Sequence, residues 1–472
     1  MKKPALHWQI LIALIFAILY GIVFSTQYTI SEAAIEKFQK KKVSHKVIEK
    51  LRTKEGKVCV TAVEFQNQLE EVLTKKEREK YGRLIKKYAY DNDPVSTISW
   101  MGDIFLRALK MLIIPLILSS LISGVTNIGV GDNLGKMGLK TMMYYLSTSI
   151  FAIITGLVLV NIIRPGVGAD LNFVMDVEGL VEKQRTLKEI VIGIVPENIF
   201  YAFTNSNMLS IIFFAILFGY FITKVAKKQR EMLSDFFNAI FDVMMKITMF
   251  IIRFTPLGVF GIVAKVVADQ DDLMGLLSRM SIYMFTVIAA LLIHAFVTLP
   301  LIMRFVAKVN PWKHLKNMST PLLTAFSTSS SGATLPLTID AVENNSKVSN
   351  KVSSFTLPLG ATINMDGTAL YECVAALFIA QAYGVDLNIL QQIVIVITAL
   401  LASIGAAAIP MAGLVMITVI LTAIGLPLEG VGLILAVDRI LDMFRTAINV
   451  WSDSCGAVTI AKSEGEQLSV DI

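Results

Sequence analysis

Residues 327–336 read Ser-Thr-Ser-Ser-Ser-Gly-Ala-Thr-Leu-Pro and interrupt a hydrophobic segment that extends from Pro321 to Thr338. A second hydrophobic segment, residues 402–425, is interrupted in the same way by Ser403-Ile404-Gly405-Ala406-Ala407-Ala408-Ile409-Pro410. Neither segment is long and regular enough to form one uninterrupted membrane helix. We therefore predict two re-entrant helical hairpins, buried in protein or lining a wet cavity, because lipid offers no partners for non-helical backbone.

Each interrupted segment is followed by a hydrophobic helix that carries acidic residues. Asp366 and Glu372 follow the first hairpin, and Asp438, Asp442 and Asp453 follow the second. This hairpin-then-helix order, occurring twice, is typical of inverted-repeat transporters whose binding site lies where the repeats meet. Close helix packing through small residues would explain the glycines and alanines, but not the acids.

The composition of the whole chain is that of a membrane protein. Hydrophobic residues make up 54% and charged residues only 17% of the 472 residues, whereas roughly a quarter of the residues in soluble domains are charged. Residues 8–24, 141–163 and 282–303 are apolar stretches that approach or reach the length needed to cross a bilayer. The sequence thus predicts an all-α membrane protein with eight transmembrane helices plus the two hairpins.

Basic residues in the short loops predict the orientation. Lys136, Lys140, residues 304–316 and Lys462 fall on one side, which we expect to be cytoplasmic together with both termini. The expected location is the inner or plasma membrane.

Residues 31–93 carry 16 Lys or Arg and 11 Asp or Glu, which predicts a solvated, partly helical external cap. Contact of this cap with anionic lipid or a partner is the alternative.

The helix after the second hairpin carries a polar face. Its charged and polar residues step by three or four positions and so share one side of a helix: Asp438, Asp442, Arg445, Thr446, Asn449 and Asp453. Each ionised side chain at mid-membrane costs on the order of 2.5 to 3.5 kcal/mol even on a lenient insertion scale. These charges therefore need partners, either from the protein or from a bound solute.

Two interpretations of Asp442 and Arg445 remain open at this point. An i,i+3 ion pair is a common structural device, although a buried pair gains little over apolar residues of similar volume. A cation and an anion one turn apart also suit a zwitterionic dicarboxylate. Arg445 can bind a carboxylate through two hydrogen bonds, while Asp442 accepts from an ammonium.

Asn364-Met365-Asp366-Gly367-Thr368 places a helix-breaking glycine among oxygen-bearing side chains. A break frees carbonyl groups, which together with the carboxylates of Asp366 and Asp453 can form an oxygen cage for sodium. A simple helix kink with an Asn or Asp cap is the alternative.

Glu372 lies one turn beyond Thr368 in an apolar run, where burial penalises the ionised form and makes a proton easy to hold. A permanently neutral glutamate is the competing interpretation.

These motifs resemble one family, the dicarboxylate/amino acid:cation symporters, which include the excitatory amino acid transporters and their bacterial and archaeal homologues. The matches are the serine-rich hairpin ending Ala333-Thr334-Leu335-Pro336, residues 364–372, the second hairpin from Ser403 to Gly413, and residues 442–453. The resemblance implies a homotrimer. A scaffold of helices one, two, four and five would hold the remaining helices and both hairpins, which carry substrate across the membrane as an elevator.

The resemblance also implies the division of the chain. We expect the first transmembrane helix at residues 1–25, a charged extracytoplasmic loop at 26–96, scaffold helix two at 97–140, transport-domain helix three at 141–168, scaffold helices four and five at 169–270, transport-domain helix six at 280–308, re-entrant hairpin one at 315–340, broken helix seven at 350–382, re-entrant hairpin two at 388–425 and amphipathic helix eight at 428–464.

The binding residues follow from the same resemblance. Substrate contacts are expected at Ser330, Ser331, Thr368, Gly413, Asp442, Arg445, Thr446 and Asn449. The family resemblance implies about three sodium ions at sites of the kind found in such transporters. Their contacts are expected at Tyr145, Thr148, Ser149, Asn364, Asp366, Asn449 and Asp453, and at Ser403, Ile404 and Ala406 in the second hairpin. Without the resemblance, the hydroxyls of the third span would be interpreted as helix-packing groups.

Single positions refine the expected activity. Within the family, members that transport acidic amino acids have an arginine at position 445, and members that transport neutral amino acids lack it. Members that transport C4-dicarboxylates lack the acid at position 442. Glu372 resembles the glutamate that carries the proton in proton-coupled members. We therefore predict import of L-glutamate or L-aspartate with sodium and a proton. A C4-dicarboxylate or neutral amino acid symporter of the same family is the alternative.

The chain departs from the family pattern in three places. The family has an arginine near the site at the position of Ser329 or of Met443, and this chain has neither, which leaves potassium counter-transport open. Trp451-Ser452 stand where a small residue and a glycine are usual before Asp453. The charged connection after the first span is also longer than in many relatives.

Two other classes of protein fit less well. An intramembrane hydrolase would use a hairpin serine, but the sequence has no Gly-x-Ser-x-Gly elbow, and its histidines lie outside the core motifs: His7, His45, His294 and His314. A passive ion channel is distinguished by its inability to drive uptake against a gradient. We expect no enzyme activity and no nucleic-acid partner; the expected partners are a small solute, membrane lipid and further copies of the chain.

Overall fold

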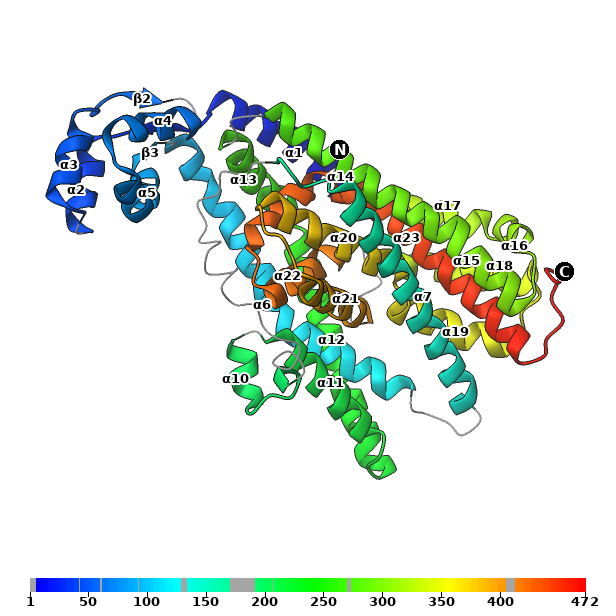
Figure 1. Ribbon diagram of the computed structural model, residues 1–472. Coiled ribbons are helices and arrows are strands. Elements are labelled where there is room, and N and C mark those ends of the chain that lie inside the picture. The colour runs from blue at the N-terminus through cyan, green and yellow to red at the C-terminus, as the bar shows by residue number, and fades with distance from the viewer. Residues whose placement is uncertain are drawn as a thin grey trace, which may run out of the picture. The chain divides into compact units, whose positions relative to one another are not determined.

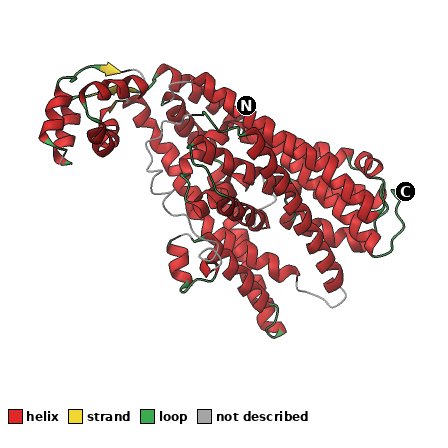
Figure 2. Ribbon diagram, viewed as in Figure 1, coloured by secondary structure: helices red, strands yellow, loops and turns green. Residues whose placement is uncertain are grey.

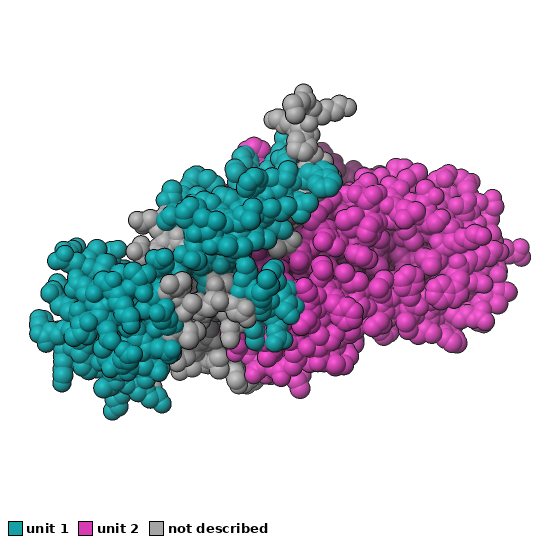
Figure 3. Space-filling model, turned by 90° about the horizontal axis from the view of Figure 1, so that it is seen from above, with its two compact units in different colours: residues 1–106, 168–179, 253–279 teal, residues 107–167, 180–252, 280–472 magenta. Residues whose placement is uncertain are grey.

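The computed structural model describes residues 6–41, 43–59, 62–91, 93–128, 134–169, 192–205, 207–269, 273–404 and 412–472. Most of these residues are helical, and the short strands lie near the N-terminus (Figure 2). The chain divides into two compact units, coloured separately in Figure 3. Residues 1–106, 168–179 and 253–279 form the first unit, and residues 107–167, 180–252 and 280–472 form the second.

In the first unit, α1 (Leu6–Val23) packs along α13 (Thr255–Ala268). Gly21 permits this approach, because a Cβ there would lie 2.7 Å from the carbonyl oxygen of Ala264. Small residues at such crossings are typical of membrane helices, which associate through close van der Waals packing.

The segment between α1 and α6 (Asp93–Ile128) is a small folded region with its own core. β1 (Gln27–Thr29) lies between β2 (Val58–Cys59) and β3 (Tyr90–Asp91) in an antiparallel sheet. The helices of this region are α2 (Glu32–Lys40), α3 (His45–Arg52), α4 (Ala62–Val72) and α5 (Lys75–Ala89). Their apolar faces meet in a common core. The expected loop over residues 26–96 is therefore more structured than its charge pattern indicates, because strands of two or three residues have no alternating pattern to detect.

Further helices of different lengths follow along the chain. They include α7 (Leu134–Ile163), α10 (Ile199–Thr204), α11 (Met208–Ile222), α12 (Lys227–Ile252), α14 (Leu273–Ile293), the π-helix η1 (His294–Thr298), α15 (Leu299–Ile302), the π-helix η2 (Met303–Ala307) and α16 (Pro311–Asn317). The expected boundary between helices two and three at residue 140 is wrong, since α7 already begins at Leu134. Lys136 and Lys140 suggested a loop there, but lysines near a helix end can extend their ammonium groups to water.

Four helices in the described part of the chain are long and apolar enough to cross a bilayer, at residues 94–126, 136–163, 273–307 and 350–382. α12 and α13 would make a fifth if they form one bent span, and α1, α11 and α21 (Ile389–Ile404) are shorter apolar helices. The chain is thus a helical, multi-pass membrane protein. The count of eight spans stays a prediction.

Both interrupted segments contain a pair of helices. In the first, α17 (Ser319–Thr328) and α18 (Ser331–Asn344) meet at Ser329, whose φ of 51° lies in the left-handed region that commonly ends a helix. In the second, α21 packs against α22 (Ala412–Ile424), and the connection at residues 405–411 lies outside the described residues.

The broken helix and the last helix bring the polar motifs together. α19 (Asn350–Ile363) and α20 (Asp366–Ala382) are separated at Asn364 and Met365, whose ψ values of 78° and 59° are not helical. A 3₁₀ turn, η3 (Leu428–Gly430), precedes α23 (Val431–Ser463). α17, α18, α19 and α20 all pack against α23, and α7 packs along α20 (Figure 1).

Candidate functional site

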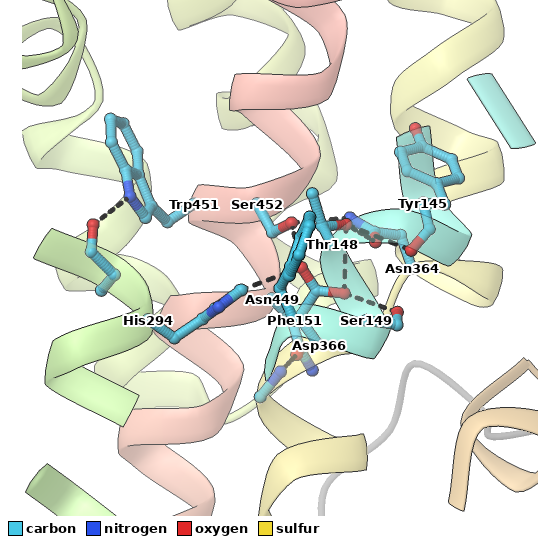
Figure 4. A network of polar contacts seen from close by, with 12 residues as sticks. Tyr145, Thr148, Ser149, Phe151, His294, Asn364, Asp366, Asn449, Trp451 and Ser452 are labelled. Carbon is cyan, nitrogen blue, oxygen red and sulfur yellow. Dashed lines mark hydrogen bonds and ion pairs between the residues drawn. The ribbon is translucent and has the colours of Figure 1, made fainter. Parts of the chain in front are cut away.

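Asp366, the first residue of α20, is fully buried and is held by three other elements. Ser149 Oγ of α7 donates to Oδ1 at 2.6 Å, and Ser452 Oγ of α23 donates to Oδ2 at 2.6 Å. His294 Nε2 of η1 lies 3.2 Å from the same Oδ2 (Figure 4). These contacts satisfy a carboxylate at a depth where an unpaired one would be costly.

Asn364 links the helix break to α7 and α23. Its Nδ2 donates to Asp453 Oδ1 at 2.9 Å and to Ser452 Oγ at 3.0 Å, while its Oδ1 accepts from Thr148 Oγ1 at 3.3 Å. Carboxylate, amide and hydroxyl oxygens are therefore concentrated around one break in the backbone. Oxygen donors at a discontinuous helix are the arrangement that binds sodium in transporters.

Tyr145 joins this layer through α19. Its Oη donates to the carbonyl oxygen of Thr356 at 2.7 Å. A Cβ at Gly360 would lie 2.8 Å from that Oη and 2.5 Å from Asp453 Oδ1, so the glycine lets both oxygens approach the α19 backbone. The structure thus assembles one group of the residues that the sequence assigned to sodium: Tyr145, Thr148, Ser149, Asn364, Asp366 and Asp453.

The second-hairpin members of that predicted set are placed differently. Ser403 is buried in α21, and its Oγ donates to the carbonyl oxygen of Leu400 in the same helix at 2.8 Å. α21 ends at Ile404. Ala406 lies outside the described residues.

The unusual Trp451-Ser452 pair is built into the site. Ser452 Oγ donates to Asp366 and accepts from Asn364. Trp451 Nε1 donates to the carbonyl oxygen of Ala295 at 3.0 Å, and its ring stacks on His314 with 5.3 Å between centroids. Trp451 therefore connects α23 to η1 and α16, and Ser452 connects it to α20 and the helix break.

His294 is a site residue that the sequence motifs missed. Its position outside the core motifs was misleading, because the π-helix turns its ring toward Asp366 (Figure 4). Two signals point to it: an ionisable residue within an apolar span is by default a functional candidate, and π-helical turns are frequent at functional sites.

Asn449 ties α23 to the start of α20. Its Oδ1 accepts from the Gly367 amide at 2.8 Å, and its Nδ2 donates to Thr368 Oγ1 at 3.0 Å. A Cβ at Gly367 would lie 2.6 Å from the carbonyl oxygen of Arg445. This glycine therefore serves close approach of two helices, while the helix break itself lies at Asn364 and Met365.

Arg445 is buried and shared by two carboxylates of its own helix. Its Nε donates to Asp442 Oδ1 at 2.9 Å, and its Nη1 donates to Asp438 Oδ1 at 3.3 Å. The guanidinium also lies over the Tyr371 ring, with Cζ 4.4 Å from the centroid, a cation–π arrangement. The ion-pair interpretation of Asp442 and Arg445 is therefore realised in this geometry.

Asp438 and Tyr371 enlarge this cluster beyond the predicted set. Tyr371 Oη donates to Asp438 Oδ1 at 2.5 Å. Asp438 Oδ2 is buried and has no hydrogen-bond partner among the described residues. The sequence places Asp438 on the polar face without a role, and only tertiary contact reveals Tyr371 as its partner.

Gly413 lies against the guanidinium. A Cβ at this position would be 2.8 Å from Arg445 Cζ, so the absence of a side chain permits the start of α22 to approach Arg445. The second hairpin and α23 meet here, as the predicted substrate set requires.

The serines of the first hairpin occupy the turn between α17 and α18. Ser330 caps α18, with its Oγ accepting from the Ala333 amide at 3.2 Å, and Ser331 is buried. Contact of this hairpin with α23 includes an edge-to-face pair of Phe326 and Phe444 at 5.1 Å. Within the described chain, no side-chain hydrogen bond joins Ser331 or Thr446 to the other predicted substrate residues.

Glu372 is fully buried in α20, one turn beyond Thr368. Neither of its carboxylate oxygens has a hydrogen-bond partner among the residues that the structure describes. An anion in such surroundings would be strongly disfavoured relative to the neutral acid.

Comparisons with known proteins agree with this arrangement. A family model described as the sodium:dicarboxylate symporter family matches residues 6–463 of the chain. Excitatory amino acid transporter 3 of Mus musculus is 38% identical over 422 residues, which cover 78% of this chain and 80% of the mouse protein. Excitatory amino acid transporter 1 of Ambystoma tigrinum is 36% identical over 432 residues, which cover 80% of this chain and 79% of the salamander protein.

Proposed function

Because the chain belongs to the sodium:dicarboxylate symporter family, we propose that it is a secondary active symporter that imports L-glutamate, L-aspartate or both, driven by sodium. Membership confirms the resemblance of the hairpin and broken-helix motifs, and it makes the chain a transporter and not an enzyme. The observation that carries the substrate class is the buried pair of Asp442 and Arg445 on one face of α23.

An acidic amino acid offers a partner to each member of that pair. Arg445 would bind the side-chain carboxylate of the substrate and Asp442 its ammonium. Arg445 already donates to Asp442, so the substrate carboxylate would take the place of Asp442 on Arg445. Asp442 would then lose Arg445 as a partner and would bind the substrate ammonium instead. Every buried charge then keeps a partner throughout binding, which avoids the cost of an unpaired ion. Thr368, Thr446, Asn449, Gly413, Ser330 and Ser331 would complete the substrate site.

Sodium would bind where the oxygen atoms collect around the break between α19 and α20. Asp366, Asn364 and Asp453 supply carboxylate and amide oxygens there, and Tyr145, Thr148 and Ser149 supply hydroxyls from α7. Sodium ions would neutralise Asp366 and Asp453, so that ion and substrate binding stabilise the same contact between α20 and α23. Asn449 and the backbone of the second hairpin near Ser403, Ile404 and Ala406 would provide further contacts, for about three ions by analogy with related transporters.

Glu372 would carry a proton with each transport cycle. Its burial without a partner among the described residues supports a neutral acid when the site is closed. Potassium counter-transport is not part of this proposal, since neither Ser329 nor Met443 is an arginine.

The proposed architecture is a homotrimer with eight membrane helices, two re-entrant hairpins and both termini in the cytoplasm. The moving part would consist of α7, residues 280–308 and the two hairpin-then-helix repeats, α17 to α20 and α21 to α23. The packing of α17 to α20 on α23 supports their movement as one body. Such a body could carry a closed site across the membrane as an elevator.

Uptake into liposomes tests the proposal. Purified full-length chain should accumulate labelled glutamate or aspartate against a gradient when sodium is high outside, and replacing sodium with choline should abolish accumulation. Accumulation that persists without sodium would contradict the proposal, and equilibration without accumulation would indicate a channel.

Arg445→Met tests the substrate class in the same system. The variant should lose uptake of both acidic amino acids, because the side-chain carboxylate loses its cation. Native preference for succinate or for serine over glutamate would instead favour the C4-dicarboxylate or neutral amino acid alternative.

A further inference from the structure

Arg439 brings a second guanidinium to the carboxylate that Arg445 already contacts. Its Nη1 donates to Asp442 Oδ2 at 3.3 Å, whereas Arg445 Nε donates to Oδ1 at 2.9 Å. Each oxygen of Asp442 therefore accepts from a different arginine. The Arg439 side chain is 23% exposed and that of Asp442 only 4%, so Arg439 contacts the acid from the outer side of the cluster.

The charge balance of the cluster depends on Arg439. Asp438 and Asp442 together carry two negative charges, and Arg445, which contacts both, supplies one positive charge. Arg439 supplies the second and makes the group of four neutral. Without it, the buried cluster would hold one uncompensated negative charge beside the guanidinium that is to receive a substrate carboxylate.

We propose that Arg439 is a specificity-determining residue that favours acidic over neutral substrates by compensating Asp442. This inference rests on the proposed function. An acidic amino acid brings one more carboxylate than a neutral one, and that carboxylate must approach Arg445 in competition with Asp442. Because Arg439 contacts Oδ2, Asp442 keeps a cationic partner when the substrate carboxylate takes its place on Arg445, and the local negative charge is reduced. Both effects favour the second carboxylate.

Two substitutions separate charge from packing. Arg439→Met removes the charge but keeps an unbranched, helix-favouring side chain of similar reach. Arg439→Lys keeps the charge and loses the planar fork of donors. Arg304→Met is the matched control, because Arg304 is an exposed arginine of η2. Full-length variants are reconstituted in liposomes, and KM and kcat for sodium-driven uptake of glutamate, aspartate and serine are measured, together with thermal stability.

Arg439→Met should raise KM for glutamate and aspartate on the order of tenfold, with a smaller change in kcat. The KM for serine should change by less than about threefold. Arg439→Lys should recover most of the acidic affinity, and Arg304→Met should match the native chain. Unchanged acidic KM in Arg439→Met would overturn the inference. An equal loss for all three substrates with lower thermal stability, unrepaired by lysine, would also overturn it, since it would indicate a structural ion pair only. Absence of sodium-driven uptake by the native chain would overturn the proposed function itself, and the inference with it.

Discussion

His294 Nε2 lies 3.2 Å from Asp366 Oδ2, although 72 positions separate the two residues in the chain. Both side chains are fully buried. With its proton on Nε2, the ring donates to a carboxylate that we assign to sodium binding. His294 Nδ1 has no hydrogen-bond partner among the described residues, so this contact is the main polar anchor of the ring. Groups that orient a metal-binding carboxylate commonly matter nearly as much as the ligand.

His294→Ala should therefore weaken sodium binding. Without the ring, Asp366 loses one of the groups that fix its orientation, and we expect the sodium concentration for half-maximal uptake to rise by about tenfold or more. Uptake at saturating sodium should fall less. The measurement is sodium-dependent uptake in liposomes, with His45→Ala as the control, because the His45 side chain is exposed. An unchanged sodium dependence would show that the contact is only structural.

Glu372→Gln should remove the dependence of net uptake on external pH. Glutamine keeps the size of the neutral acid but can neither release nor take up the proton. Sodium-dependent exchange of internal for external glutamate should persist. Uptake and exchange are measured from pH 5 to 9 for the variant and for Glu464→Gln, which alters an acid at the end of α23 that pairs with Lys140 at 2.6 Å. A variant that follows pH like the native chain would rule out the proton role.

Gly413→Ala should weaken substrate binding. The added methyl group would lie 2.8 Å from Arg445 Cζ, and displacing a buried guanidinium from its charged partners should raise KM for acidic amino acids on the order of tenfold or more. Gly138→Ala is the matched control, because among the residues that the structure describes a Cβ there meets only Phe355 Cζ at 3.5 Å, an ordinary contact. Equal KM values for the two variants would indicate that the start of α22 moves freely away from Arg445.

The region between α1 and α6 should fold as an isolated fragment of residues 26–92. Its core is made of its own side chains, and Gln27 pairs with Asp91 across the sheet, so its two ends lie together. The fragment should unfold in one cooperative thermal transition, followed by circular dichroism. A gradual loss of signal would mean that this region needs the membrane helices to fold.

Glu77 should make that fragment less stable in acid. Hydrogen bonds from Lys50 and then from Thr74, at the start of α5, lower the pKa of Glu77 from 4.5 to about 2. A lowered pKa means that this contribution is present above pH 4.5 and is lost as the pH falls toward about 2. Glu77→Gln should therefore lower stability at pH 7 and flatten this part of the pH dependence, whereas Glu49→Gln, which alters an exposed side chain of α3, should not. Identical pH profiles for native and Glu77→Gln fragments would contradict this assignment.

Much of the site could be predicted from sequence because each helix carries its own periodicity. The steps from Asp442 to Arg445 and on to Asn449 place these residues on one face regardless of neighbouring elements. The oxygen-rich Asn364 to Thr368 motif is likewise local. Such patterns, together with two interrupted hydrophobic segments, indicate a membrane transporter and the polar residues of α20 and α23. The expected roles of the α7 hydroxyls and of Gly413 followed only from the family resemblance.

What sequence spacing could not supply is the identity of partners across helices. His294 reaches Asp366, Tyr371 reaches Asp438, and Ser452 joins Asp366 to Asn364 only because α7, η1, α20 and α23 pack at particular rotations and depths. The sheet in residues 27–91 is equally non-local, since its pairings join strands too short to show a pattern.

The sequence by itself determined which groups must be buried and paired, since the cost of a lone charge in lipid is a property of that residue. Only the tertiary structure decided which partner each group has, because that depends on distances between segments far apart in the chain.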